Sequence, residues 1–271
     1  APAVVLLSAV NLEPFLPQPA AFAAQTPERF VTAAEICRTL AGPDTRILLL
    51  APPADTEWGA ALRRQSETCD SLETVTVPNA YPADHPRLVA AQLGLDPASP
   101  VWHVAADAVP GLIDVVRAHA RSGDRTVVLA GGGVTDPVHL RLPVGTPLED
   151  LLANRLADAP CDLIENGLLT GRAWPSARRG IGTETRAVLA VPRPRERELL
   201  GFLRPGFDRQ SYGTSFLSAL RPRFAEPVTT ALRGERRPCI TCGYCETVCP
   251  VDIMPHYLHK CLFRDGLEEA D

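Results

Sequence analysis

Short apolar runs alternate with amphipathic stretches along the first part of the chain. Apolar runs of strand length predict β-strands at residues 4–10, 46–50, 72–77, 101–104 and 126–130. Between them, apolar residues recur at intervals of three and four and predict α-helices at about residues 27–42, 58–64, 85–93 and 108–120. Such regular alternation is typical of a parallel or mixed α/β layer. We expect this layer to occupy residues 1–122.

The pattern changes after Gly131, Gly132 and Gly133. These glycines follow a predicted strand, but neither Lys-Ser/Thr nor an immediate helix comes next, so they predict a turn and not a phosphate-binding loop. Shorter strands are expected at 139–142, 161–164 and 168–170 around one helix at 147–153, which indicates a small α+β unit over residues 123–174. Residues 175–230, rich in Pro and Arg, are interpreted as a connecting region that contains one β-like run at 186–191.

Composition and charge narrow the class of protein. Hydrophobic residues make up 45% of the 271 residues and charged residues 22%, as in ordinary soluble globular proteins. The net charge of −5 gives no reason to expect nucleic acid or anionic lipid as a partner. Arginine is concentrated between Arg172 and Arg237, where there are 14 arginines and six acidic residues. This segment is either a solvated face or a docking surface for an acidic partner or a membrane.

The chain shows no membrane-spanning or targeting segment in its sequence. No apolar run approaches the roughly 18–20 residues that span a bilayer, so we expect no transmembrane segment. Residues 1–10 lack the positive region of a signal peptide. The first strand begins almost at once and the chain stops on the charged residues 266–271, so we expect the sequence to be a fragment of a longer chain.

Eight cysteines fall into two groups. Cys37, Cys69 and Cys161 are isolated and are interpreted as ordinary thiols. The other five lie between Cys239 and Cys261. A secreted disulfide framework spreads its cysteines through a short chain, whereas these are concentrated at one end, so a reducing, cytoplasmic compartment is expected.

Four of these cysteines form the motif Cys239-x-x-Cys242-x-x-Cys245-x-x-x-Cys249, followed directly by Pro250. Gly243 lets the loop turn tightly, so that three thiolates can face one cluster while backbone N–H groups bond its sulfurs. The spacing matches a bacterial [4Fe–4S] motif. Structural zinc usually takes two separated pairs of ligands, so a zinc-stabilised scaffold without a redox role is the lesser alternative.

The fourth ligand is left open by the spacing. In two-cluster ferredoxins the cysteine before proline binds the other cluster, so Cys249 serves either this cluster or a neighbouring one. In the second case the fourth ligand is Cys261 or lies outside this chain. His256 and His259 lie three residues apart beside the motif and are either tuning groups for the cluster or part of a solvated helix face.

The cysteine motif and the residues that follow it, Val251-Asp-Ile-Met-Pro255, resemble the first ferredoxin motif of the C subunit of Rnf electron-transport complexes. The rest of the chain resembles the A subunits (NqrA) of the Na⁺-translocating NADH:quinone reductases. The stretches that carry this second resemblance are Val101-Trp-His103, Val128-Leu-Ala-Gly131 with Asp136-Pro137, Gly145-Thr-Pro-Leu-Glu-Asp-Leu151, Asn166-Gly-Leu-Leu-Thr-Gly171, Arg197-Glu-Leu-Leu-Gly-Phe-Leu203 and Pro205-Gly-Phe-Asp208. The NqrA proteins have lost most of the four-cysteine motif, so this chain lies between the two families.

The resemblance implies a fold and a setting. It implies a Rossmann-like α/β domain at 1–122, an SLBB-type (soluble-ligand-binding) β-grasp domain at 123–174, the connecting region 175–230 and a helical 4Fe–4S ferredoxin-like segment at 231–271. It also implies that the protein attaches peripherally to the cytoplasmic side of the inner membrane, with other subunits of a redox complex as partners. A second cluster motif is expected beyond Asp271.

The resemblance bears on cofactors as well. Glu13-Pro14-Phe15 is similar to the Glu-Pro-Tyr of Rnf C subunits, which lies near their flavin pocket. Their glycine-rich flavin loop would precede Ala1, so FMN is not carried over to this chain. NADH and quinone remain open as ligands.

These features together predict an electron-transfer subunit of a membrane-associated NADH:quinone or NADH:ferredoxin oxidoreductase. It relays single electrons through a [4Fe–4S] cluster bound by Cys239, Cys242, Cys245 and Cys249. No nucleophile–base pair for hydrolysis is apparent, so no catalytic side chain is predicted. The alternative is a quinone- or ligand-binding or structural subunit, in which the cluster only stabilises the fold.

Overall fold

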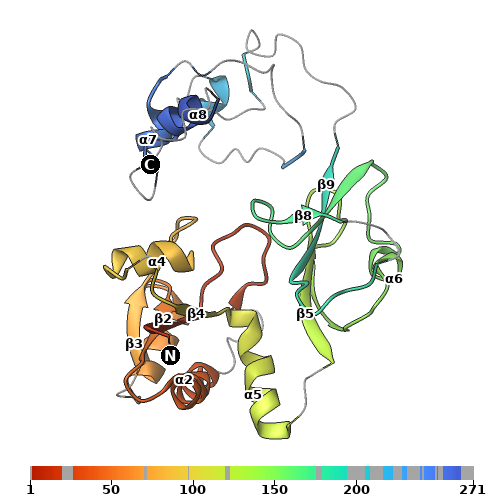
Figure 1. The fold of residues 1–271 in the computed structure, drawn as a ribbon. Helices are drawn as coiled ribbons and strands as arrows, with labels where there is room; N and C mark the ends of the chain where they lie inside the picture. The colour runs from red at the N-terminus through yellow and green to blue at the C-terminus, as the bar shows by residue number, and fades with distance from the viewer. Residues whose placement is uncertain are drawn as a thin grey trace.

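The structure is a computed structural model, and it describes residues 2–19, 27–69, 72–96, 98–119, 123–174, 179–193, 205–207, 216–221, 228–230, 239, 241–247, 249 and 253–263. Two β-sheets with their helices form most of this part (Figure 1). The mixed α/β class expected from the sequence is confirmed. None of the helices within these ranges is both long and apolar enough to cross a bilayer.

The first sheet has four parallel strands in the order β3-β2-β1-β4. The strands are β1 (Val4–Ser8), β2 (Arg46–Ala51), β3 (Leu72–Thr76) and β4 (Val101–Val104). Each was predicted to within two residues at either end. β1 is buried along its whole length, as is typical of a central parallel strand covered on both faces. In register, Val5 lies opposite Ile47 of β2 and Trp102 of β4.

Helices cover both faces of this sheet. The helices are α2 (Glu28–Ala41), α3 (Glu57–Ser66), α4 (Pro86–Gln92) and α5 (Val109–Ala118). On one face Phe30 of α2, Leu62 of α3 and Ile113 of α5 share a core, whereas Val89 of α4 packs in a separate core on the other face. The α3 helix begins where the Thr56 hydroxyl accepts a hydrogen bond from the Gly59 N–H at 3.0 Å.

The connections change side between β1 and β4. Helices α2 and α3 follow β1 and β2 on one face, and α4 joins β3 to β4 across the other face. The carboxyl ends of β1 and β4 therefore lie at a topological switch point, where open α/β sheets usually bind their ligands. The short 3₁₀ helix η1 (Ala106–Ala108) follows β4 at this edge.

The second sheet has five strands in the order β6-β5-β9-β7-β8. They are β5 (Asp124–Ala130), β6 (Val138–Pro143), β7 (Cys161–Glu165), β8 (Arg172–Ala173) and β9 (Ala187–Pro192), and the helix α6 (Leu148–Leu152) packs against them. The β5–β9 pair is parallel, and the other pairs among these strands are antiparallel. Gly131–Gly133 form a turn, as predicted. Gly131 has φ +107°, and a Cβ at this position would lie 2.3 Å from the Ala190 carbonyl oxygen, so both the conformation and the space favour glycine.

Two predictions made from the sequence differ from the observed structure of this sheet. The predicted strand at 168–170 is wrong, because these residues form a turn in which the Gly171 N–H donates to the Gly167 carbonyl at 2.9 Å. The short strand β8 comes directly after that turn. The β-like run at 186–191 is a strand, but as β9 it lies at the centre of the sheet, between β5 and β7. The sheet therefore continues beyond residue 174, into the segment expected to be a connection.

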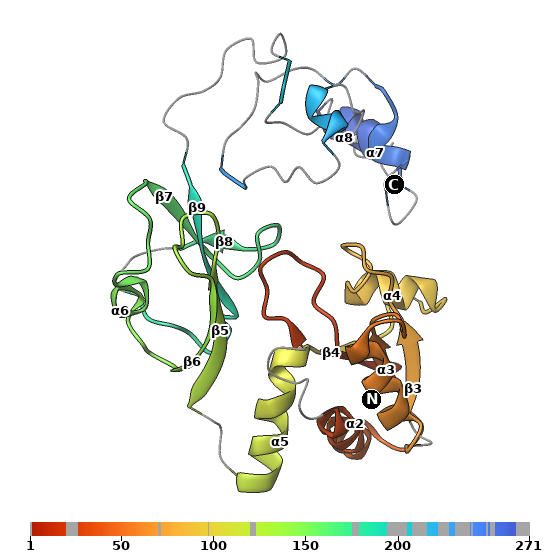
Figure 2. The same ribbon diagram turned by 180° about the vertical axis from the view of Figure 1, so that it is seen from behind.

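The remaining described elements are η3 (Leu217–Leu220), α7 (Tyr244–Thr247) and α8 (Pro255–Phe263). Helices α7 and α8 contact each other. Figure 2 shows the long loop after β1 reaching from the first sheet to the second. The assignments of residues 123–174 to a β-grasp domain and of residues 231–271 to a ferredoxin-like segment remain predictions.

Candidate functional site

The cysteine motif begins in a loop before α7: Cys239 and Cys242 precede this helix, Cys245 lies in it and Cys249 follows it. Two residues between its cysteines have left-handed backbone conformations, Thr241 with φ +57° and Gly243 with φ +77°. The Gly243 carbonyl then accepts the Glu246 N–H at 3.0 Å, which forms the first turn of α7. Cys239 and Cys242 are exposed, whereas Cys245 and Cys249 are half-buried. Gly243 therefore makes the tight turn for which the sequence suggested it.

The cysteine thiols of this motif form no disulfide and do not converge on one point. All eight cysteines lie within the described residues and none is in a disulfide, so no such bond competes for the motif. Among the same residues, no three His, Cys, Asp or Glu side chains lie close enough together to hold a metal ion. One sulfur already has an amide donor, since the Thr241 N–H lies 3.4 Å from the Cys239 sulfur. Ligation by Cys239, Cys242, Cys245 and Cys249 remains a prediction.

Helix α8 brings two polar side chains, His256 and Lys260, to the cysteine motif. His256 Nδ1 lies 3.9 Å from the Cys245 sulfur and 3.9 Å from a Glu246 carboxylate oxygen. Lys260, the one lysine in the sequence, donates from Nζ to the Thr241 hydroxyl at 3.0 Å. Cys261 is buried, with 5% of its surface exposed.

The isolated cysteines lie away from this loop. Burial raises the pKa of Cys37, which is part of the first core. Burial and the neighbouring Asp162 carboxylate raise the pKa of Cys161, which packs beside the second core. Both therefore favour the protonated thiol, which is a poor nucleophile and a poor metal ligand.

A second polar site joins the two sheets. Glu13, in the loop after β1, is 7% exposed, and its carboxylate accepts three hydrogen bonds from the turn that follows β7. The donors are the Leu169 N–H at 2.9 Å, the Thr170 N–H at 2.7 Å and the Thr170 hydroxyl at 2.6 Å. The chain packs so closely here that a Cβ on Gly167 would lie 1.8 Å from Glu13 Oε1. Glu13 is therefore fully engaged within the protein.

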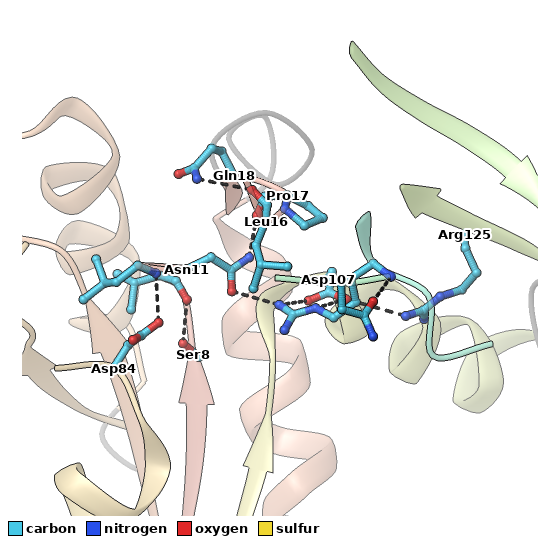
Figure 3. Close-up of polar contacts among 12 residues, drawn as sticks. Ser8, Asn11, Leu16, Pro17, Gln18, Asp84, Asp107 and Arg125 are labelled. Atoms are coloured by element: carbon cyan, nitrogen blue, oxygen red, sulfur yellow. Dashed lines mark hydrogen bonds and ion pairs between the residues drawn. The ribbon is translucent and has the colours of Figure 1, made fainter. Parts of the chain in front are cut away.

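Arg186 makes the return contact from the second sheet. Figure 3 shows two of the side chains it contacts, Asn11 and Asp107, with Arg125 on the far side of Asp107. The Arg186 guanidinium binds both carboxylate oxygens of Asp107, at 2.6 and 3.0 Å, and donates to Asn11 Oδ1 at 2.9 Å. The Asp107 side chain is only 4% exposed, and Arg125 lies 3.5 Å from it on the other side. Two carboxylate–guanidinium pairs thus meet at the switch point of the first sheet.

The backbone around Arg186 is fixed as well. Its N–H donates to the Asn166 side-chain carbonyl at 2.7 Å, and the Asn166 N–H donates to the Ala187 carbonyl at 2.8 Å. Asn166 has φ +70°, a conformation that asparagine tolerates better than most residues. Sequence reasoning noted the stretch 166–171 but assigned it no role. The glycines and the asparagine of this stretch are the feature of the sequence that could have indicated a close approach of two chain segments.

A cavity of about 700 Å³ lies beside this junction. It is bordered by α5, the start of β5 and part of β6. Three arginines, Arg29, Arg125 and Arg141, line it together with acidic groups that include Asp114 and Glu184. The mixed charges favour neither an anionic nor a cationic ligand.

The fold and the sequence each have known counterparts. The fold resembles that of an NAD⁺-reducing [NiFe]-hydrogenase, with TM-scores of 0.53 in the H₂-reduced state and 0.54 in the air-oxidised state. The match covers 71% of this chain and 41% of the other at 14% and 13% identity, so it shows a shared α/β architecture alone. A comparison with models of known protein families finds no match.

The sequence is similar to proteins named as the A subunit of Na⁺-translocating NADH-quinone reductase. The relative from Yersinia pestis bv. Antiqua (strain Angola) is 27% identical over 274 residues, which covers 99% of this chain and 58% of that protein. The relative from Marinomonas sp. (strain MWYL1) is 32% identical over 149 residues, 55% of this chain and 34% of that protein. The chain therefore spans less than two thirds of the length of these relatives.

Proposed function

We propose that this chain is an electron-transfer subunit of an NADH-quinone reductase complex and that it binds a [4Fe–4S] cluster. Cys239, Cys242 and Cys245 are its proposed ligands, and Cys249 is either the fourth ligand or a ligand of a neighbouring cluster. The observation that supports this most is the spacing of four cysteines before Pro250, none of them in a disulfide, in a chain whose relatives are named as subunits of such a reductase.

The donor set fits an iron–sulfur cluster by its chemistry. Thiolates are the ligands that such clusters use, and none of these thiols is lost to a disulfide. Their lack of convergence is consistent with a site that forms as the cluster binds, because metal binding and local folding are commonly coupled. In this proposal the left-handed residues Thr241 and Gly243 are the points at which the loop turns to gather the sulfurs.

A bound cluster would supply one-electron redox chemistry, and the surrounding residues would adjust it. The Thr241 N–H is already directed at the Cys239 sulfur, and an N–H donor stabilises negative charge on sulfur. The Lys260 ammonium is tied to the same threonine, so it places a positive charge beside the loop. Both effects favour the reduced form of a cluster.

The membrane attachment and the partners of this chain are proposed from the names of the same relatives. The relatives' name implies a complex that acts on NADH and quinone, so we propose that this chain attaches peripherally to the membrane part of such a complex, on the cytoplasmic side. Its partners are then the other subunits. FMN is not proposed for this chain, because the one residue of the flavin resemblance that bears charge, Glu13, is engaged by Leu169 and Thr170.

Anaerobic reconstitution with iron and sulfide tests the cluster. We expect a brown protein that contains iron and sulfide and no stoichiometric zinc, with a visible band that dithionite bleaches. Cys242→Ala should abolish the band, whereas the matched variant Cys69→Ala, at a half-buried thiol remote in sequence, should retain it. Brown colour retained in Cys242→Ala would contradict the ligand assignment, and bound zinc without sulfide would favour a zinc scaffold.

A second experiment separates electron relay from a structural role. In the assembled complex, electron paramagnetic resonance during NADH turnover should show the cluster cycling between two oxidation states. A cluster that is present but never changes state would favour the alternative, a ligand-binding or structural subunit in which the cluster only stabilises the fold.

A further inference from the structure

The loop at residues 9–18, which we call the joint loop, leaves the carboxyl end of β1 and packs on the second sheet (Figure 2). Leu16, only 6% exposed, shares a core with Val128 of β5 and Leu189 of β9. Phe15 packs beside it and has φ +65°, a strained conformation for a bulky residue. A segment that begins in the first sheet thus completes the hydrophobic core of the second.

The polar contacts of the joint loop are reciprocal. Here the first unit is the first sheet with its helices, and the second unit is the second sheet with α6. Glu13 reaches from the first unit into the turn at 167–170, and Arg186 reaches from the second unit back to Asn11 and Asp107. The Glu13 carboxylate is held through both of its oxygens, because two backbone N–H groups donate to Oε1 and a hydroxyl donates to Oε2. The two units are thus joined by polar contacts that run in both directions.

We propose that the joint loop is a clamp that fixes the second sheet over the carboxyl edge of the first, and that Glu13 is its main positioning residue. The second unit then occupies, as a permanent intramolecular partner, the edge at which sheets of this kind usually bind a ligand. At that edge Arg186 contacts both Asn11 and Asp107. This inference does not depend on the cluster.

Hydrogen–deuterium exchange on the intact chain tests the clamp directly. In Glu13→Ala, the amides of Leu169 and Thr170 lose their acceptor, so their exchange should rise by about fivefold to tenfold, the factor that corresponds to one net hydrogen bond. Amides of β1 and β2 should stay protected, which shows that the first sheet is still folded. In the matched variant Glu149→Gln, at an exposed glutamate of α6, exchange at both positions should not change.

A double-substitution cycle makes the test specific to the geometry. Gly167→Ala places a methyl group where the Glu13 carboxylate lies, so it should raise exchange at Thr170 although the carboxylate is still present. When Glu13→Ala is already present, the space is free, and Gly167→Ala should add little. Unchanged exchange in Glu13→Ala, or strictly additive effects of the two substitutions, would overturn the proposal.

Discussion

The ion pair between Arg186 and Asp107 allows a quantitative prediction. Arg186→Met keeps most of the aliphatic stem but removes a guanidinium that contacts both oxygens of a carboxylate whose side chain is 4% exposed. Removing one partner of a buried pair typically costs about 3–5 kcal/mol, because the other charge is left without compensation. Arg125, 3.5 Å from Asp107, compensates part of this loss. We therefore expect the free energy of unfolding to fall by about 3 kcal/mol, the lower end of that range.

Urea unfolding is the suitable assay, since urea is uncharged and does not screen the ion pair as guanidinium would. Tryptophan fluorescence reports on both units, through Trp58 in the first core and Trp174 in the second. The matched control is Arg46→Met: Arg46 pairs with Glu73 at 2.8 Å, but both side chains are more than half exposed, so the expected loss is below about 1 kcal/mol.

The outcome that would refute this reasoning is equal destabilisation by Arg186→Met and Arg46→Met. A second variant gives independent evidence. Replacing both charges, as Arg186→Met with Asp107→Leu, should recover part of the loss, because the Asp107 carboxylate is then no longer buried without Arg186. The recovery should be only partial, because Arg125 loses its carboxylate partner in this double variant. A double variant as unstable as the sum of the two single variants would show that packing, and not the buried charge, dominates at this site.

Three further predictions concern the cores. Burial alone would raise the pKa of Glu165, but hydrogen bonds from Thr185 and Arg172 and nearby arginine charges lower it overall. Its stabilising contribution should therefore be present above pH 4.5 and disappear as the pH falls through the lowered pKa, and Glu165→Gln should flatten this part of the pH dependence of the urea midpoint. Gly133→Ala should lower the melting temperature, because its Cβ would lie 2.2 Å from the Cys161 sulfur, whereas Gly111→Ala meets open space and should be neutral or slightly stabilising. Leu49→Ala, at a position 1% exposed, should lower the free energy of unfolding by about 2–5 kcal/mol in the same urea assay.

Local patterns were sufficient to predict the first sheet. Its strands are short apolar runs bounded by proline, glycine or polar residues, and its helices show the three-and-four spacing of a single buried face. The burial of these strands can be predicted from the sequence itself, since β1 and β2 are apolar at nearly every position. Strand order is less accessible, because β1 and β4 are adjacent although much of the first unit separates them along the chain.

The second unit shows where local patterns fail. Residues 168–170 look like a strand because Leu168 and Leu169 are apolar, yet they form a turn that Glu13 holds from far away in the sequence. The partners Asp107 and Arg186 are separated by 79 residues, and no local spacing predicts their contact. At the cysteine motif the situation is reversed. There the sequence spacing indicates a cluster more clearly than the described geometry does, because its thiols do not converge.

The central position of β9 has a consequence for how the chain is made. β9 is the last strand of its sheet to leave the ribosome, yet it is the one that joins β5 to β7. Until it is synthesised, β5 with β6 and β7 with β8 are two separate strand pairs, and two-stranded units are at best marginally stable. The sheet therefore closes in one late step, and ribosome-bound chains that end before Ala187 should expose the apolar edges of β5 and β7 to chaperones or to one another.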